Sequence, residues 1–106
     1  MATIEDFKKL NLRIATVKAV QEHPNADRLY LVTVDLGGED RQLVAGIRRH
    51  YSPPELVGKQ VVVVENIAPA VIRGVESRGM LLAAQDGERC VVVTPEKEVA
   101  PGSVVR

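Results

Sequence analysis

The chain has 106 residues, which suits one domain with an ordinary hydrophobic core and leaves little room for a second. Valine dominates the apolar residues and aromatic residues are scarce, a composition that favours β-sheet. The 14 basic and 14 acidic residues cancel, which argues against a protein that binds any polyanion. No apolar run approaches the roughly 18 to 20 residues of a membrane helix, so we expect no membrane partner.

The single cysteine and the charged N-terminal segment favour a cytoplasmic protein. Cys90 has no second cysteine to pair with, so the chain lacks the disulfide framework of a small secreted protein. Residues 1–12 carry charges of both signs and do not follow the pattern of a signal peptide. We therefore expect an intracellular, cytoplasmic location.

The first predicted element is a short helix within residues 1–11. Thr3 and Asp6 have the spacing of a capping box, and Phe7 and Leu10 contribute to an apolar side. A helix of this length is not stable alone. We therefore expect it to dock on another part of the chain.

A long strand is predicted over residues 12–20. Its alternation changes phase, because Leu12 and Ile14 share one parity whereas Val17 shares the other. Such a change indicates a β-bulge, which we expect near Ala15–Thr16.

The next predicted unit is a β-hairpin. A loop over residues 22–27, rich in turn-forming residues, leads into strands over 29–36 and 41–47. Gly37–Gly38 marks the turn between these strands. A two-residue and a four-residue turn both remain open, since both keep the same side chains on the inner face.

A second short helix is predicted after the hairpin. Ser52 and Glu55 form a capping box, and Pro53 occupies the first helical position. Gly58 ends this helix after about one and a half turns.

The remaining elements are predicted to be strands and one long loop. A strand over residues 60–67 contains Val61–Val64, a run without alternation that indicates burial on both faces. A loop follows over residues 68–78. Further strands are expected over residues 80–84 and 89–94.

Three strands, a short helix and two more barrel strands are the element order of a five-stranded OB-fold barrel, with the helix between strands 3 and 4. We therefore expect one all-β domain over residues 1–106. Its extensions are the N-terminal helix in residues 1–11 and a C-terminal segment over residues 95–106. A β-sandwich is the alternative, which the capped helix in the middle makes less favourable.

No residue pattern indicates catalysis, a metal or a cofactor. His23, His50 and Cys90 do not have the spacing of a compact metal-ligand pair, and both histidines are expected to be surface loop residues. Ser77 lacks a nucleophile elbow, because Val75 stands where a glycine is required. We therefore expect a protein that is not an enzyme, with no catalytic residues, no metal and no cofactor.

The barrel prediction also places a binding face. OB barrels bind ligands on strands 2 and 3, between the loops that here span residues 22–27 and 68–78. Arginine offers a planar fork of donors that suits phosphate. The arginines expected on this face or its loops are Arg28, Arg41, Arg48, Arg73 and Arg78. Few rings remain to stack bases, so a folded RNA read by shape fits better than a single strand.

Nine segments, in this order and spacing, resemble the tRNA-binding domain family. They are Asp6–Leu10, Leu12–Val17, Pro24–Leu29, Val34–Gly38, Gly46–Arg48, Leu56–Lys59, Asn66–Pro69, Glu76–Met80 and Pro101–Gly102. The resemblance implies an OB fold that binds tRNA by shape, with contacts at Asn25, Arg28, Arg48, Arg73, Ser77 and Met80. The chain departs from the family at Ala70–Val71, where the family often carries a basic residue.

The family includes the C-terminal domain of methionyl-tRNA synthetase, a separate subunit of that enzyme and free-standing tRNA-binding proteins. Gly46–Arg48 followed by Tyr51 is most similar to the synthetase branch. The resemblance implies a homodimer formed through the N-terminal helix and the tail from Pro95. It leaves open whether this dimer is free-standing or is the tRNA-binding part or subunit of the synthetase, in which case the catalytic subunit would be a partner. A peptide-binding secretion chaperone is an alternative, because the segment 68–72 is apolar, and a purely structural dimerisation module is another.

Overall fold

The computed structural model describes all residues, 1–106, and consists mainly of strands. The elements in chain order are α1 (Ile4–Lys8), β1 (Leu12–Glu22), β2 (Tyr30–Asp35), β3 (Asp40–Ala45), α2 (Pro53–Leu56), β4 (Gln60–Val64), β5 (Ala70–Ile72), β6 (Val75–Ser77), β7 (Met80–Leu81), β8 (Ala83–Asp86), β9 (Arg89–Val92) and β10 (Val104–Val105). Neither of the two short helices has the length and apolar character needed to cross a lipid bilayer.

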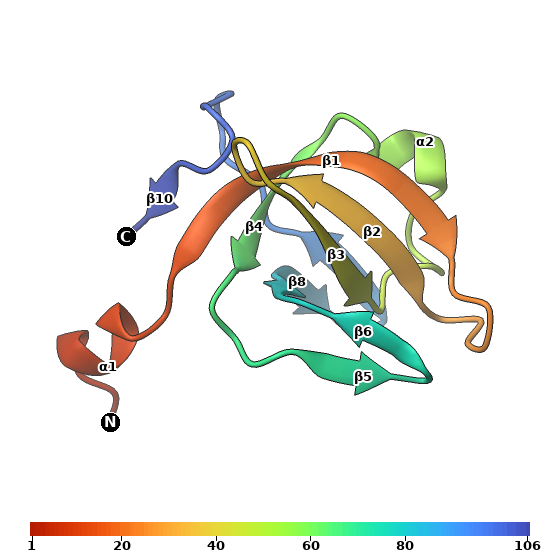
Figure 1. Cartoon of the computed structure of the whole chain (residues 1–106), viewed down its shortest axis with the longest axis horizontal. Helices are drawn as coiled ribbons and strands as arrows, with labels where there is room; N and C mark the ends of the chain where they lie inside the picture. The colour runs from red at the N-terminus through yellow and green to blue at the C-terminus, as the bar shows by residue number, and fades with distance from the viewer.

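The central sheet is antiparallel and curls into a nearly closed barrel. Its strand order is β3–β2–β1–β4–β7, and β10 pairs with the start of β1. Figure 1 shows β1 as a long curved strand that runs from α1 across the top of the molecule. The edge strand β3 meets the other end of the sheet, where the Arg78 amide donates to the Gln42 carbonyl at 3.0 Å. The predicted all-β barrel with a short helix between its third and fourth strands is confirmed.

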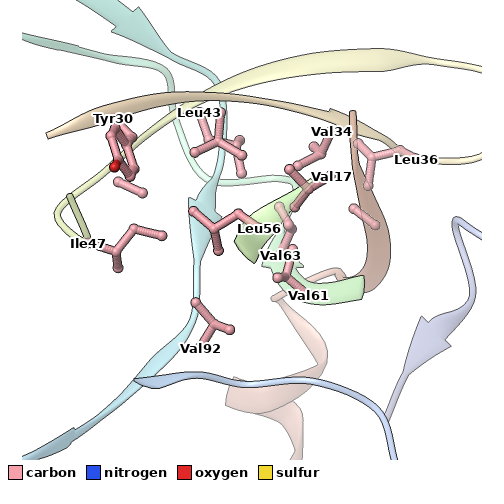
Figure 2. Close-up of a cluster of buried hydrophobic side chains, with 13 residues drawn as sticks. Val17, Tyr30, Val34, Leu36, Leu43, Ile47, Leu56, Val61, Val63 and Val92 are labelled. Carbon is pink, nitrogen blue, oxygen red and sulfur yellow. The ribbon is translucent and has the colours of Figure 1, made fainter. Parts of the chain in front are cut away.

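The barrel interior is filled by alternate residues of the strands and by one residue of α2. Val17, Val34 and Val61 are almost fully buried, and Leu56 of α2 is buried among them. Figure 2 shows Leu56 at the centre of this cluster. The helix α2 therefore plugs the barrel.

The capping box of α2 is present on the glutamate side. The Glu55 carboxylate accepts from the amide and the hydroxyl of Ser52, at 2.8 and 2.9 Å. These bonds lower the pKa of Glu55 below its ordinary value of 4.5. Gly58, with φ of 89°, follows the helix as predicted.

The bulge in β1 lies later than predicted. The ladder between β1 and β4 runs unbroken from Leu12 to Thr16, so Ala15–Thr16 is regularly paired and that placement was wrong. The register against β2 shifts between Val17 and Ala19 instead. Lys18, the extra residue at this bulge, is exposed, and its ammonium group forms an ion pair with the Asp40 carboxylate. Because the Lys18 side chain faces solvent, the extra residue can be accommodated in the strand.

The run Val61–Val64 is buried on both faces, as predicted. Val61 and Val63 face the barrel interior. Val62 and Val64 belong to a second cluster with Leu12 and Ile14, against which Leu82 and Val105 pack. The C-terminal strand β10 therefore covers part of the outer face of β4.

The helix α1 is tied to the barrel by polar bonds, and its apolar side stays partly exposed. Thr3 and Asp6 form the predicted capping box. Asn66 ties the end of the helix to the barrel, accepting from the Asn11 amide at 2.7 Å and donating to the Lys9 carbonyl at 2.8 Å. No residue of α1 is buried.

Several predicted boundaries differ in the structure. The segment expected to be a loop over 68–78 contains the hairpin of β5 and β6. The strand expected over 60–67 ends at Val64, and the region 80–94 divides into β7 and the hairpin of β8 and β9.

The turn after β2 has two central residues. Gly37 and Gly38 both have positive φ, and the Leu36 amide donates to the Glu39 carbonyl at 2.8 Å. Positive φ at both central positions is the geometry that matches the twist of a hairpin.

Candidate nucleic-acid interface

The loop between β1 and β2 and the turn between β5 and β6 lie against each other. The Asn25 side-chain amide donates to the Arg73 carbonyl at 3.2 Å, and the Arg73 guanidinium donates to the Asn25 carbonyl at 3.0 Å. Figure 1 shows the end of this loop beside the β5–β6 turn. We call residues 22–28 and 70–77 the paired loops. The two loops predicted to flank the binding face therefore form one connected edge.

His23 belongs to the first of the paired loops and is buried. Only 3% of its surface is exposed, so the prediction of a surface histidine was wrong, whereas His50 is exposed as predicted. The Nδ1 of His23 accepts from the Asn25 amide at 2.9 Å, and the Nε2 of His23 lies 2.9 Å from the Ile72 carbonyl oxygen. The partner that buries this ring comes from a distant segment, which the local sequence does not reveal.

Arg48 supports the loop between β1 and β2 through hydrogen bonds from its guanidinium group. Its Nη1 donates to the Ala26 carbonyl at 2.9 Å and its Nη2 to the Glu22 carboxylate at 2.8 Å. Its side chain is 22% exposed. The guanidinium is therefore largely occupied by contacts within the chain.

Arg41 and Ser77 are also engaged within the chain. Arg41 donates to the Glu65 carbonyl at 2.6 Å and to the Glu39 carboxylate at 2.7 Å. The buried Ser77 hydroxyl accepts from the Val44 amide at 2.9 Å and donates to the Gly79 carbonyl at 3.0 Å. The bond from Arg41 to Glu65 joins β3 to the residue after β4, and the Ser77 bonds join β3 to β6 and to the segment before β7, where the barrel closes.

The other sequence-predicted residues are exposed. Arg28 takes part in no ion pair of the chain. Asn25 and Arg73 lie at the surface of the paired loops, and Met80 is 45% exposed. The Arg78 side chain is 59% exposed, and its Nε is 3.9 Å from the Glu76 carboxylate.

Arg28 stands between two open hollows. One, of about 510 Å³, is lined by Arg28, Arg73 and Asn25 among others. The other, of about 630 Å³, has no apolar side chain in its lining and adds Arg49 and His50 to Arg28. In the sequence, Arg49 and His50 belong to a basic run, Arg48 to His50, that contains no acidic residue, although neither was among the predicted contacts. The β8–β9 turn, which also lines this hollow, has no such signal.

Carboxylates accompany several of these arginines. Arg49 lies 3.8 Å from Asp27, and both side chains are more than half exposed. Exposed ion pairs of this kind contribute about 0 to 1 kcal/mol. A phosphate group can therefore displace them at little cost. No three His, Cys, Asp or Glu side chains gather as metal ligands would.

A family model described as "Putative tRNA binding domain" matches residues 12–104. The chain belongs to the tRNA-binding domain family. The match covers the whole barrel, the paired loops and the start of β10. The family resemblance drawn from the sequence is confirmed.

Relatives of this tRNA-binding domain occur within longer proteins. It is 55% identical over 104 residues to the methionine–tRNA ligase of Pyrococcus furiosus, a match that covers 98% of this chain and 14% of that protein. It is 50% identical over 103 residues to the enzyme of Thermotoga maritima, covering 97% of this chain and 16% of that protein. The chain thus spans about a seventh of these curated relatives. The family assigns it a binding role and not the catalytic one.

Two solved structures have the same fold over the full chain. A MetRS-related protein from Pyrococcus horikoshii has a TM-score of 0.92 and 31% identity, covering 100% of this chain and 98% of its own. The chaperone protein CsaA from Picrophilus torridus has a TM-score of 0.93 and 27% identity, with complete coverage of both chains. The tRNA-binding domain therefore matches proteins of its own length as well as parts of longer ones.

Proposed function

We propose that this domain binds folded tRNA by shape and presents it to the catalytic part of a cytoplasmic methionyl-tRNA synthetase, as a domain or as a separate subunit. The observation that carries the proposal is the position of Arg28 and Arg73, which line one open hollow on loops that are bonded to each other. Guanidinium groups held at a fixed spacing suit the phosphates and 2′-hydroxyls of a folded RNA.

The eight predicted contacts divide into exposed residues and residues that are partly or fully buried. Asn25, Arg28, Arg73, Arg78 and Met80 are exposed and would contact tRNA directly. Arg41, Arg48 and Ser77 would support the barrel and its loops without touching tRNA, because their polar groups bond within the chain. Arg49 and His50 extend the proposed contact surface through the second hollow.

The scarcity of exposed rings supports a folded target. Tyr30 is 4% exposed, and its hydroxyl donates to the Tyr51 carbonyl at 2.6 Å. Tyr30 therefore points into the barrel and offers no platform on the binding face on which bases could stack. We expect weaker binding of single-stranded oligonucleotides than of tRNA.

A salt titration of tRNA binding tests the proposal. Replacing Arg28 and Arg78 together with alanine should lower the slope of log affinity against log salt by about two units, since each phosphate contact contributes about one. The unfolding temperature should not change, because neither guanidinium supports the barrel. Lys97→Ala is the matched control, since Lys97 lines a different hollow beside α2. An unchanged slope in the double variant would remove these arginines from the interface.

The proposal includes a homodimer formed through α1 and β10. These two elements line an apolar groove of about 430 Å³. Ile4, Phe7, Leu10 and Val104 border it and are 68, 42, 47 and 50% exposed. Because these apolar side chains remain about half exposed or more beside the groove, they are available to a second copy, which offers a surface of the same kind.

Peptide binding is the second candidate function. The similarity to CsaA chaperones favours it, as does the exposed segment 68–71, in which Val71 is 73% exposed. An unfolded peptide should compete with tRNA if this reading holds. We favour tRNA, because the apolar groove of the chain lies at α1 and not at this segment.

A further inference from the structure

His23 occupies the point where the paired loops meet, and the proposed contacts do not include it. It follows β1 directly, and its ring reaches the carbonyl of Ile72 in β5. The residue is almost completely buried, so it does not face a ligand. Its two ring bonds point to different segments, one to its own loop and one to the opposite turn.

The two partners of the ring define its protonation state. The Ile72 carbonyl can only accept a hydrogen bond, so Nε2 must carry a hydrogen. The Asn25 amide can only donate, so Nδ1 must carry none. A neutral imidazole with its hydrogen on Nε2 is the one form that satisfies both bonds.

We propose that His23 is a positioning residue, which in this neutral form locks the β1–β2 loop against the β5–β6 turn and so sets the spacing of Arg28 and Arg73. The inference rests on the proposed tRNA-binding function for its effect on affinity. The lock itself stands on the geometry of the free protein.

The β5–β6 turn needs such a lock. Arg73 has φ of 53°, a conformation that residues other than glycine rarely adopt. Such a residue keeps this conformation only where its surroundings hold it. The other bonds between the loops, those of Asn25 with Arg73, are exposed to water, whereas the His23 bond is shielded by the buried ring.

If the lock is loosened, a smaller fraction of molecules holds the loops at the spacing that tRNA binding requires, so the apparent affinity for tRNA falls. The apparent dissociation constant equals the intrinsic one divided by the fraction of molecules with the correct loop spacing. If that fraction falls to about one in five, tRNA binds about fivefold more weakly. No contact with the RNA needs to change.

Two replacements of His23 distinguish its bond to Ile72, which joins the two loops, from its bond with the Asn25 amide, which lies within its own loop. The side-chain oxygen of asparagine can take the place of Nδ1 and accept from the Asn25 amide, but asparagine is too short to reach Ile72. The longer glutamine can donate to the Ile72 carbonyl from the place of Nε2. We expect His23→Asn to weaken tRNA binding about fivefold and His23→Gln to stay within about twofold of the unchanged chain. The control is Thr94→Ala, which changes an exposed side chain that lines a different hollow, away from the paired loops.

Nuclear magnetic resonance of the nitrogen-labelled full chain tests the lock without RNA. The His23 ring nitrogens should report the neutral form with hydrogen on Nε2, and the Asn25 amide should be protected from exchange. A ring that carries its hydrogen on Nδ1, or an unprotected Asn25 amide, would overturn the inference even if the variants fail to fold. Equal affinities of His23→Asn and the unchanged chain would do the same. If the unchanged chain binds no tRNA, the proposed function fails, and the ring spectra still decide whether the lock exists.

Discussion

The Ser77 hydroxyl joins two segments of the barrel, so its removal should affect stability before it affects binding. Ser77→Ala leaves the Val44 amide without its partner, and an unpaired buried donor costs about 1 to 3 kcal/mol. For a domain of this size each kcal/mol lowers the unfolding temperature by about 4 to 8 °C. Thermal unfolding followed by circular dichroism measures the change.

The control for Ser77 is Thr94→Ala, which removes an exposed hydroxyl. The folded Ser77→Ala variant should keep its tRNA affinity, measured below its unfolding temperature. An unchanged unfolding temperature together with weaker tRNA binding would make Ser77 a direct contact instead.

The arginines near the proposed binding face have different roles, which depend on the groups that their side chains contact. The alternation of the strands and the expected loops placed Arg28, Arg41 and Arg48 near the binding face. The sequence could not separate them, because the groups that occupy Arg41 and Arg48 include backbone carbonyls more than 20 positions away. The burial of His23 escaped prediction for the same reason. Residue types and loop positions identify a candidate set, whereas long-range hydrogen bonds divide it into contacts and supports.

At the scale of single elements, α2 should show a measurable dependence on acid. Bonds from Ser52 lower the pKa of Glu55, so folding favours its ionised form. The stabilisation is complete above the pKa of the unfolded chain and is lost as the pH falls through the lower pKa of the folded chain. Glu55→Gln should therefore flatten the loss of stability between about pH 5 and pH 3. Urea unfolding at a series of pH values measures this.

The comparison variant for Glu55 is Glu98→Gln, which alters an exposed carboxylate that makes no ion pair. Its acid dependence should follow that of the unchanged chain. Identical profiles for Glu55→Gln and Glu98→Gln would contradict a role of the cap in stability.

Elements with a strong local signal were predicted and weakly patterned ones were not. The capping residues placed α1 and α2, and the valine run placed β4. The strands β5 and β6 have three residues each, too few to display alternation, and their pairing depends on a turn at Arg73 and Gly74. The bulge of β1 was detected but misplaced, because Ala15 and Thr16 are small enough to suit either face.

At the scale of the whole molecule, the balance of charge bears on how tRNA is held. A chain without net charge lacks the long-range attraction of a basic protein, so its affinity depends on a few well-placed contacts. Two copies in one dimer would double these contacts and make the second binding event intramolecular. The proposed dimer and the proposed RNA binding therefore support each other energetically.

Phe7→Glu tests this link. The phenylalanine is 42% exposed on a helix with no buried residue, so the change should leave the barrel folded. A charge at this position in the apolar groove must lose its water when a second copy docks, which opposes association. Sedimentation should then give the mass of one chain, whereas the unchanged chain gives twice that mass.

Val57→Glu is the matched change, because Val57 is 49% exposed at the end of α2, away from α1. It should leave the dimer intact, so any loss of tRNA affinity confined to Phe7→Glu reports the loss of the second copy. Flexible or well-matched linkage of two sites raises affinity about 100-fold or more when both engage one ligand. A monomeric Phe7→Glu variant that binds tRNA as tightly as the unchanged chain would mean that each barrel holds its own tRNA. A monomeric unchanged chain would leave the groove at α1 to another partner.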